Sequence, residues 1–501
     1  MPGFHVEHFG CRAARADGEA VSGRLRAAGH CTQQPSQADV VIVNTCSVTA
    51  EADRAARAFI RRAHRVNPEA RIVVTGCYAQ RAPEELAALG GVAAVVGNSH
   101  KALAPEVILG LMERATQQPP FAGLQLPDGL IQIQAASTPP PMIWADDRFA
   151  HSFIEEAQVA PGAQTRPNLK IQEGCGNRCT FCVIPQTRGP LKSLPYAAVL
   201  KQVEGFVAAG GNELVLSGIN LGRWGRDLRA PEDLPGPTLA SLVRQMIEQT
   251  GLPRLRLSSI EPMDWDAELI ALMAQFGGTR LARHAHLPLQ SGSDAVLRRM
   301  HRRYRPWHYA TKVEALLRAA GPELTLGADV MVGFPGETDG EFEETLDMVR
   351  ALPFGYLHLF PFSARPGTRG WALYADSPVP PAVVEERMAA LRALAAEKSQ
   401  AHRARFVGRE LEAITLHTTA ELAGRGWTTA LTENFLPIEV KGRLGANRIV
   451  RVRAMRLNSA GTLEATANWM EPVQYAATAM SVCPKSVPLK SSSSPVSLAS
   501  A

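Results

Sequence analysis

Short apolar runs alternate with amphipathic stretches over the first hundred residues of the chain. Between the second and third runs, residues 51–70 place apolar side chains at helical spacing, with arginines on the opposite face. This alternation of strand and helix predicts an open, mostly parallel sheet. The predicted strands are rich in valine and isoleucine and cover residues 4–10, 39–48, 71–79 and 92–98.

The same alternation returns near residue 168 and continues through six units. A complete (βα)8 barrel needs two more units, which we do not find, so the pattern predicts a partial (βα)6 barrel. Its strands are expected at residues 168–174, 213–219, 254–260, 284–290, 326–334 and 356–362.

A different pattern follows the barrel. One long helix is predicted over residues 386–406, and the short strands after it predict a small antiparallel β module. In residues 111–165, prolines interrupt the apolar periodicity of both helices and strands, and we interpret this stretch as a linker or irregular segment. The fold class is therefore α/β. Its predicted parts are an N-terminal sheet domain (1–110), the linker (111–165), the partial barrel (166–400), the β module (401–472) and a disordered, serine-rich tail (473–501).

Composition narrows the class of protein. With 501 residues and 46% hydrophobic residues, the chain can bury several cores. Its net charge of +5 is compatible with a nucleic-acid partner. The N-terminus has no apolar signal core, and no apolar run reaches the roughly 18 residues of a membrane span. We therefore expect a cytoplasmic protein with no membrane partner, where clustered cysteines bind metal or perform chemistry.

The strongest chemical signal lies directly after the first barrel strand. Cys175, Cys179 and Cys182 follow Cys-x-x-x-Cys-x-x-Cys spacing. Three close thiolates favour an iron–sulfur cluster or zinc, and three ligands on a cubane cluster leave one iron open to a cofactor or substrate. The alternative is a zinc site, which would want a fourth protein ligand, yet no Cys or His follows closely.

A second set of cysteines is spread over three predicted strands. Cys11, Cys46 and Cys77 each come just after a strand, and the carboxyl ends of parallel strands gather ligands at one edge of the sheet. The alternative is three unrelated buried cysteines. Cys31 and Cys483 are expected to be free thiols without function.

The segment EGCGNRCTFCVIPQTRG (173–189), with Phe181 before the third cysteine, resembles the motif of the radical S-adenosylmethionine (SAM) superfamily. Together with the N-terminal cysteines and the β module, the chain resembles the methylthiotransferase family over about residues 4–471. The resemblance implies two 4Fe-4S clusters, one SAM-binding and held by the barrel cysteines, the other auxiliary and held by Cys11, Cys46 and Cys77. It also implies a TRAM-like, RNA-binding β module. One SAM would methylate sulfur on the auxiliary cluster, and a second would supply a deoxyadenosyl radical.

The stretches NTCSVTAEADRAARAFIRRA and HLPLQSGSDAVLRRMHRRY look most like the threonylcarbamoyl subgroup. That resemblance implies methylthiolation of C2 of N6-threonylcarbamoyladenosine at position 37 of tRNA, in the anticodon loop. It also implies an electron donor such as flavodoxin or ferredoxin, and a sulfur donor. Alternative substrates are isopentenyladenosine in tRNA or an aspartate of a ribosomal protein, and a non-catalytic iron–sulfur RNA-binding protein is a further alternative. After Cys11 the family carries Asn-Gln, whereas this chain departs from that pattern and reads GCRAARADGEAV.

Three basic runs are compatible with RNA, although each alone is more often a solvated face. One lies in the β module, one near the barrel and one on the first predicted helix. Their members are Lys441, Arg443, Arg448, Arg451, Arg453 and Arg456; Arg298, Arg299, Arg302, Arg303 and Arg305; and Arg54, Arg57, Arg61, Arg62 and Arg65.

Contacts to SAM are expected at the strand ends of the barrel, where ordinary turn chemistry is the alternative. Phe181 would pack on the adenine. The other candidates are Ser217, Gly218, Ser258, Glu261 and Gly333. Thr338 or Asp339 is predicted to cap a helix, and His284 and His286 to join a packing or polar network. No catalytic side chain is assigned.

Overall fold

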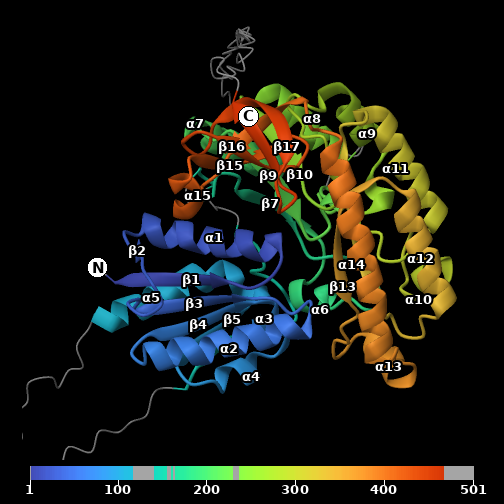
Figure 1. The fold of residues 1–501 in the computed structure, drawn as a ribbon. Coiled ribbons are helices and arrows are strands. Elements are labelled where there is room, and N and C mark those ends of the chain that lie inside the picture. The colour runs from blue at the N-terminus through green and yellow to red at the C-terminus, as the bar shows by residue number, and fades with distance from the viewer. Residues whose placement is uncertain (1, 117–139, 155–158, 162–163, 229–235, 468–501) are drawn as a thin grey trace, which may run out of the picture.

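The computed structural model describes residues 2–116, 140–154, 159–161, 164–228 and 236–467 (Figure 1). In these residues the N-terminal region forms a six-stranded sheet ordered β2-β1-β3-β4-β5-β6, and every neighbouring pair is parallel. Its strands are β1 (Gly3–His8), β2 (Cys31–Thr32), β3 (Val40–Thr45), β4 (Arg71–Gly76), β5 (Val92–Gly97) and β6 (Met142–Trp144).

Alternation along β3 explains why helices cover both faces of this sheet. Val40 and Ile42 pack with α1 (Arg12–Ala27) and α5 (Ala104–Thr116), whereas Val41 and Val43 pack with α2 (Ala50–Val66) and α4 (Pro83–Ala87). Successive strand residues point to opposite faces, so a run of valines builds two apolar layers.

One strand of this sheet comes from the segment predicted as a linker or irregular, residues 111–165. In that segment β6 pairs with β5 in the register Ala94↔Met142 to Val96↔Trp144. A strand of three residues is too short to show a period among the surrounding prolines.

The second region is a partial barrel of six parallel strands within the described residues, as the sequence predicted. Two sheets, ordered β10-β9-β7-β8 and β11-β12-β13, meet through bridges between Leu255 and Leu281 and between Ser259 and His286. The barrel strands are β7 (Asn168–Glu173), β9 (Glu213–Gly218), β10 (Arg254–Leu257), β11 (His284–His286), β12 (Thr325–Val332) and β13 (Phe354–Pro361). The short β8 (Lys192–Ser193) is antiparallel to β7.

Helices cover the outside of the partial barrel (Figure 1). They are α7 (Tyr196–Ala208), α8 (Leu239–Gln249), α9 (Ala267–Phe276), α11 (Pro306–Ala320), α12 (Asp339–Ala351) and the long α14 (Pro381–Ala404). Shorter helices are α3 (Cys77–Arg81), α6 (Ile184–Arg188), α10 (Asp294–Arg299), α13 (Arg369–Asp376) and α15 (Ala420–Gly424). Thr338 caps α12 and forms a capping box with Glu341, as the sequence predicted.

The C-terminal module is a small closed barrel. Its neighbouring strands are antiparallel except β16 and β18, whose parallel pairing closes the barrel. The strands are β14 (Glu410–Thr415), β15 (Trp427–Thr432), β16 (Pro437–Lys441), β17 (Ile449–Leu457) and β18 (Leu463–Ala467). The predicted disordered tail, residues 473–501, lies outside the described residues.

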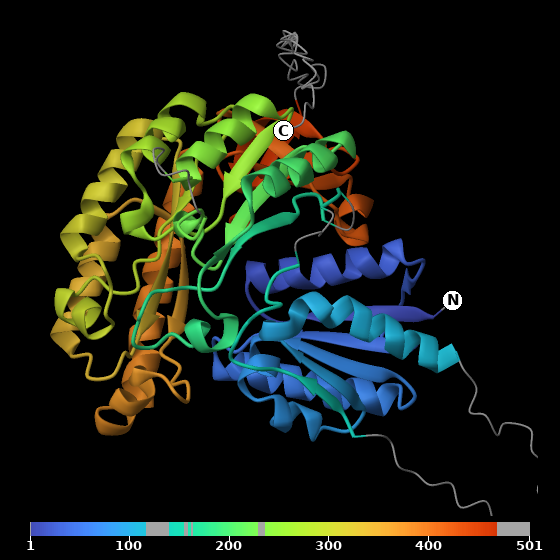
Figure 2. The ribbon, with the colours of Figure 1, turned by 180° about the vertical axis from the view of Figure 1, so that it is seen from behind.

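The N-terminal sheet meets the partial barrel at the carboxyl edge of its strands, where α3 and α6 lie side by side (Figures 1 and 2). Asn98 donates to the carbonyl of Thr187 at 2.8 Å across this joint. On the other side of the joint, the backbone N–H of Ala50 donates to Ser363 Oγ at 3.1 Å. Among the described helices, none has the length and apolar character needed to span a membrane.

Candidate functional site

The three N-terminal cysteines lie at the carboxyl ends of three neighbouring strands. Cys46 directly follows β3, Cys77 directly follows β4, and Cys11 precedes α1 as its N-cap residue. Cys46 and Cys77 are buried, and Cys11 is exposed. Burial, together with the nearby Cys77 and Cys11 thiols, raises the pKa of Cys46 to about 12. The fold therefore brings together cysteines that are up to 66 residues apart in the sequence.

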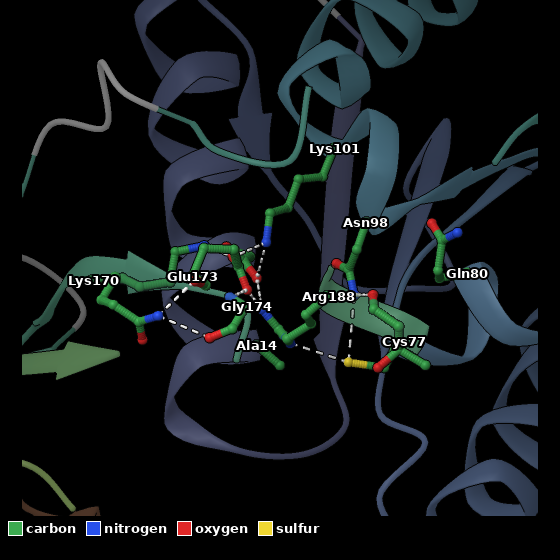
Figure 3. A network of polar contacts seen from close by, with 12 residues as sticks. Ala14, Cys77, Gln80, Asn98, Lys101, Lys170, Glu173, Gly174 and Arg188 are labelled. Atoms are coloured by element: carbon green, nitrogen blue, oxygen red, sulfur yellow. Dashed lines mark hydrogen bonds and ion pairs between the residues drawn. The ribbon is translucent and has the colours of Figure 1, made fainter. Parts of the chain in front are cut away.

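Two nitrogen donors from different elements are directed at Cys77 (Figure 3). Arg188 Nε donates to its sulfur at 3.2 Å, and Asn98 Nδ2 lies 3.4 Å from it. Arg188 is completely buried at the end of α6. Its Nη2 has no hydrogen-bond partner among the described residues. Such an orphaned buried donor indicates a further acceptor at this place.

The barrel cysteines lie in the loop between β7 and α6 and have a similar set of donors. Asn220 Nδ2 lies 3.4 Å from Cys175 Sγ, and Arg302 Nη1 lies 3.4 Å from Cys179 Sγ. Burial and the neighbouring Cys179 thiol raise the pKa of Cys182 to about 12. One arginine and one asparagine thus serve each group of three sulfurs.

The cysteine groups fit iron–sulfur clusters better than single metal ions. Among the described residues, neither group has all three sulfurs within 4.8 Å of one another. A tetrahedral zinc ion with bonds of about 2.3 Å would hold its sulfurs closer than that. Nitrogen donors directed at the sulfurs also suit a cluster, whose electron-rich sulfurs accept hydrogen bonds.

A cavity of about 350 Å³ lies where the barrel and the N-terminal sheet meet. Cys182 lines it from the barrel side, and Val48 and Thr49, which closely follow Cys46, line it from the N-terminal sheet. A molecule in this cavity can therefore contact Cys182 and also the residues that closely follow Cys46. Its other lining residues are Phe181, Val183, Ile184, Ile219, Asn220, Ser259, Glu261, Pro288, Gln290, Asp329, Met331, Phe360, Pro361, Phe362 and Ser363.

Two of the predicted SAM contacts, Phe181 and Glu261, line this cavity. Glu261 also forms an ion pair of 2.5 Å with Arg302, and so connects the cavity wall to the donor on Cys179. The other four candidates are not among the described residues that line the cavity. They are Ser217, Gly218, Ser258 and Gly333.

These four candidates have other contacts or surroundings. Ser217 Oγ lies 3.4 Å from the carbonyl of Leu169, and a Cβ on Gly218 would lie 2.9 Å from Gln172 Cβ. Ser258 is buried, and its neighbour Ser259 lines the cavity instead. Gly333 has a φ of 76°, and its N–H donates to Glu337 at 2.8 Å. The positive φ gives Gly333 a backbone reason to be glycine.

Sequence reasoning missed Asp329, although it did predict a packing or polar network for His284 and His286. Asp329 on β12 lines the cavity and lies 3.3 Å from His286 Nε2 and 3.2 Å from His358 Nδ1. Burial opposes ionisation of Asp329, but both histidines outweigh it and lower the pKa of its carboxyl group. His284 bonds the hydroxyl of Tyr356 at 2.7 Å. The sequence did contain a signal for this residue, because Asp329 is a charged residue within the apolar run LGADVMVGF.

The three basic runs differ in how far they are exposed. Near the barrel, Arg302 is buried beneath Cys179, and Arg299 is paired with Glu341 at 2.7 Å. On α2, Arg57 is paired with Glu85 at 3.0 Å. On the β module, Arg451 and Arg453 are exposed on β17.

Family models match both halves of this site. Residues 3–97 match a family described as "Uncharacterized protein family UPF0004", and residues 169–349 match the "Radical SAM superfamily". A solved radical S-adenosylmethionine methyltransferase, TsrM from Kitasatospora setae, aligns with a TM-score of 0.47 and 14% identity over 72% of each chain.

Curated relatives extend over nearly the whole chain. "Threonylcarbamoyladenosine tRNA methylthiotransferase MtaB" of Bacillus subtilis is 35% identical over 90% of this chain and 93% of the relative. The protein of the same name in Aquifex aeolicus is 32% identical over 89% and 98%. "tRNA-2-methylthio-N(6)-dimethylallyladenosine synthase" of Cereibacter sphaeroides is 33% identical over 89% and 94%. The chain therefore belongs to the radical SAM methylthiotransferase family.

Proposed function

We propose that this protein methylthiolates C2 of N6-threonylcarbamoyladenosine at position 37 of tRNA. The observation that carries the proposal is the cavity between the two cysteine groups, lined by Cys182 on one side and by Thr49 near Cys46 on the other. Transfer of a methylthio group to an unreactive carbon needs a radical source and a sulfur source at one substrate, and this cavity can present the substrate to both.

In this proposal Cys175, Cys179 and Cys182 hold the SAM-binding 4Fe-4S cluster, and Cys11, Cys46 and Cys77 hold the auxiliary one. When bound, the clusters and SAM supply the deoxyadenosyl radical and the methylated sulfur. The chain's own part is to orient these groups and to exclude water. Phe181 offers an aromatic face for the adenine of SAM, and Glu261 offers a carboxylate for its amino or ribose groups.

The polar wall of the cavity supports a threonylcarbamoyl substrate over an isopentenyl one. Asp329 and Gln290 line the cavity, and Asp329 contacts His286 and His358. Arg12 on α1 interacts electrostatically with Asp329 and Tyr356. A ureido group and a carboxylate would find donors and acceptors here. An apolar isopentenyl group would offer nothing to Gln290, whose Oε1 has no hydrogen-bond partner among the described residues.

Recognition of tRNA is assigned to the TRAM-like module, where β17 exposes arginines that can contact phosphates. An exposed anticodon loop would then present its unstacked base to the cavity. An electron donor such as flavodoxin or ferredoxin and a separate sulfur donor complete the proposed reaction.

The test uses the anaerobically reconstituted protein with SAM, a reductant and a sulfide source. It is given two tRNAs, one carrying threonylcarbamoyladenosine and one carrying isopentenyladenosine, and mass spectrometry of the nucleosides measures the products. We expect a methylthio product from the first tRNA only. A product from the second tRNA only would support the isopentenyladenosine alternative and overturn the proposal.

Two variants show that any product comes from the proposed site. Cys175→Ala should abolish the release of deoxyadenosine as well as the methylthio product. Cys77→Ala should abolish the methylthio product while the cleavage of SAM continues. The choice of RNA as substrate would be overturned if neither tRNA reacted and a ribosomal protein gained a methylthio group instead.

A further inference from the structure

Five buried charged side chains form one network at the joint between the N-terminal sheet and the barrel (Figure 3). Asp17 on α1 and Glu173 on β7 supply the carboxylates. Lys101 lies 3.2 Å from Asp17, Lys170 lies 2.6 Å from Glu173, and Lys101–Glu173 and Lys170–Asp17 are also paired. Arg188 Nη1 lies 3.1 Å from Asp17 and 2.8 Å from Glu173.

This network carries an excess of positive charge. Three cations, Lys101, Lys170 and Arg188, face the two carboxylates of Asp17 and Glu173. Arg188 is completely buried and contacts Cys77 as well as both carboxylates. A buried uncompensated cation is costly, so the charge needs an anionic partner nearby.

The three nitrogens of Arg188 show where that partner lies. Its Nη1 is occupied by the carboxylates, its Nε donates to Cys77 Sγ at 3.2 Å, and its Nη2 has no partner among the described residues. A cubane held by three thiolates carries net negative charge and electron-rich sulfurs. It would balance the network and give Nη2 an acceptor.

We propose that Arg188 is the positioning residue of the auxiliary cluster, donating hydrogen bonds to Cys77 and to a cluster sulfur and raising the reduction potential of the cluster. The inference rests on the proposed function, which assigns that cluster to Cys11, Cys46 and Cys77. Reduction adds negative charge to the cluster, and a buried cation in hydrogen-bond contact stabilises the more negative state.

Arg188 also ties the two cysteine groups together along the chain. It ends α6, which begins two residues after Cys182. Its side chain therefore connects the element that follows the SAM-binding loop to a ligand of the auxiliary cluster. Movement of one site relative to the other would break this contact.

The test measures the potential of the auxiliary cluster alone, in the full-length chain. Cys175→Ala, Cys179→Ala and Cys182→Ala together remove the barrel ligands, and EPR-monitored redox titration follows the cluster that is left. Into this parent we place Arg188→Lys, which keeps the charge, Arg188→Gln, which keeps a donor, and Arg188→Met, which keeps neither. Without Arg188 the network holds two cations and two carboxylates, so the uncharged variants leave it neutral.

We expect Arg188→Gln and Arg188→Met to shift the equilibrium toward the oxidised cluster by about tenfold, which is about 59 mV for one electron. Arg188→Lys should stay near the parent. A matched control is Arg365→Met. Arg365 is buried at the same joint, donates to Ser47 Oγ at 2.9 Å and pairs with Asp53, and among the described residues it makes no hydrogen bond to a cysteine. It should leave the potential unchanged.

Equal potentials in the parent, Arg188→Lys and Arg188→Gln would overturn the inference, as would an equal shift in Arg365→Met. If Arg188→Met does not hold a cluster, the reduction potentials of Arg188→Lys and Arg188→Gln are compared, and their difference tests the inference. A parent that carries no cluster at all would overturn the cluster assignment itself. That result differs from a cluster whose potential ignores Arg188, which would overturn this inference alone.

Discussion

At the scale of single residues, the lack of a side chain at Gly10 makes room for the side chain of Cys46. The φ of Gly10 is 117°, and a Cβ built on it would lie 2.4 Å from Cys46 Cβ and 2.7 Å from its sulfur. We predict that Gly10→Ala displaces Cys46 and removes most of the auxiliary cluster while the SAM-binding cluster is retained. Iron analysis together with the EPR signal of each cluster measures this loss.

The matched control is Gly442→Ala in the C-terminal module. Gly442 has a φ of 115°, but an added Cβ there would have no described atom within 4 Å. The substitution should therefore cost backbone strain of about 1–2 kcal/mol and leave the iron content unchanged. Equal iron loss in both variants would contradict the role given to Gly10.

Residue type and spacing predicted the six cysteines as ligands, because Cys46 and Cys77 follow strands rich in valine and the three barrel cysteines are closely spaced in the loop after β7. They could not reveal the donors around the sulfurs. Arg302 looked like part of a basic surface run, yet the fold buries it beneath Cys179. Lys170 and Asp17, which are 153 positions apart, meet only after the two domains dock. Such long-range pairs have no local period or motif.

At the scale of elements, the positions of the strands were predictable from the sequence. Which residues at the strand ends line the cavity was not. All six barrel strands lie where the apolar runs predicted them. The candidate Ser258 is buried and does not line the cavity, whereas its neighbour Ser259 does, in the segment that follows the end of β10 at Leu257. Helix α14 starts at Pro381, five residues before its predicted start, since proline favours the first helical position.

A buried group of charges around Glu213 joins the barrel strands to the C-terminal module through Arg254. Glu213 on β9 lies 2.8 Å from Arg256 Nε, 3.3 Å from Arg254 and 3.2 Å from Arg166. Arg254 also pairs with Glu412 of β14. Burial opposes ionisation of Glu213, but Arg256, Arg166 and Arg254 outweigh it and lower its pKa to about 2.

We predict that Glu213→Gln destabilises the protein by about 3 kcal/mol at pH 7, because it leaves buried arginines without their partner. A depressed pKa contributes stability above the unfolded value of 4.5, and that stability is lost as the pH falls toward 2. The difference between variant and wild type should therefore narrow below pH 4.5 in urea unfolding of the cluster-free chain.

The control for this prediction is Glu248→Gln on α8. Glu248 pairs with Arg244 at 3.3 Å, and both side chains are exposed. An exposed pair contributes about 0–1 kcal/mol, so this variant should unfold almost like wild type. A pH-independent difference for Glu213→Gln would refute the electrostatic explanation.

At the scale of the whole molecule, the C-terminal module presents exposed arginines on β17. We predict that Arg451→Ala with Arg453→Ala weakens tRNA binding and reduces the salt dependence of the affinity. Each lost phosphate contact should lower the slope of log K against log salt by about 0.7–0.9. Filter binding between 50 and 200 mM salt, in the salt range where such contacts dominate, measures both effects.

Arg318→Ala provides the comparison, because Arg318 is exposed on α11 and pairs only weakly with Glu314, at 3.8 Å. Its removal should leave affinity and slope as in wild type. The surface account of tRNA binding fails if Arg318→Ala weakens binding as much as the β17 double variant does.

The central claim is that two groups of three cysteines each hold their own cluster. Iron and sulfide analysis of anaerobically prepared wild type, Cys11→Ala/Cys46→Ala/Cys77→Ala and Cys175→Ala/Cys179→Ala/Cys182→Ala proteins tests it most directly. We predict about eight iron atoms in the wild type and about four in each triple variant. Bound zinc, or about four iron atoms in the wild type with no change in the first triple variant, would contradict the claim.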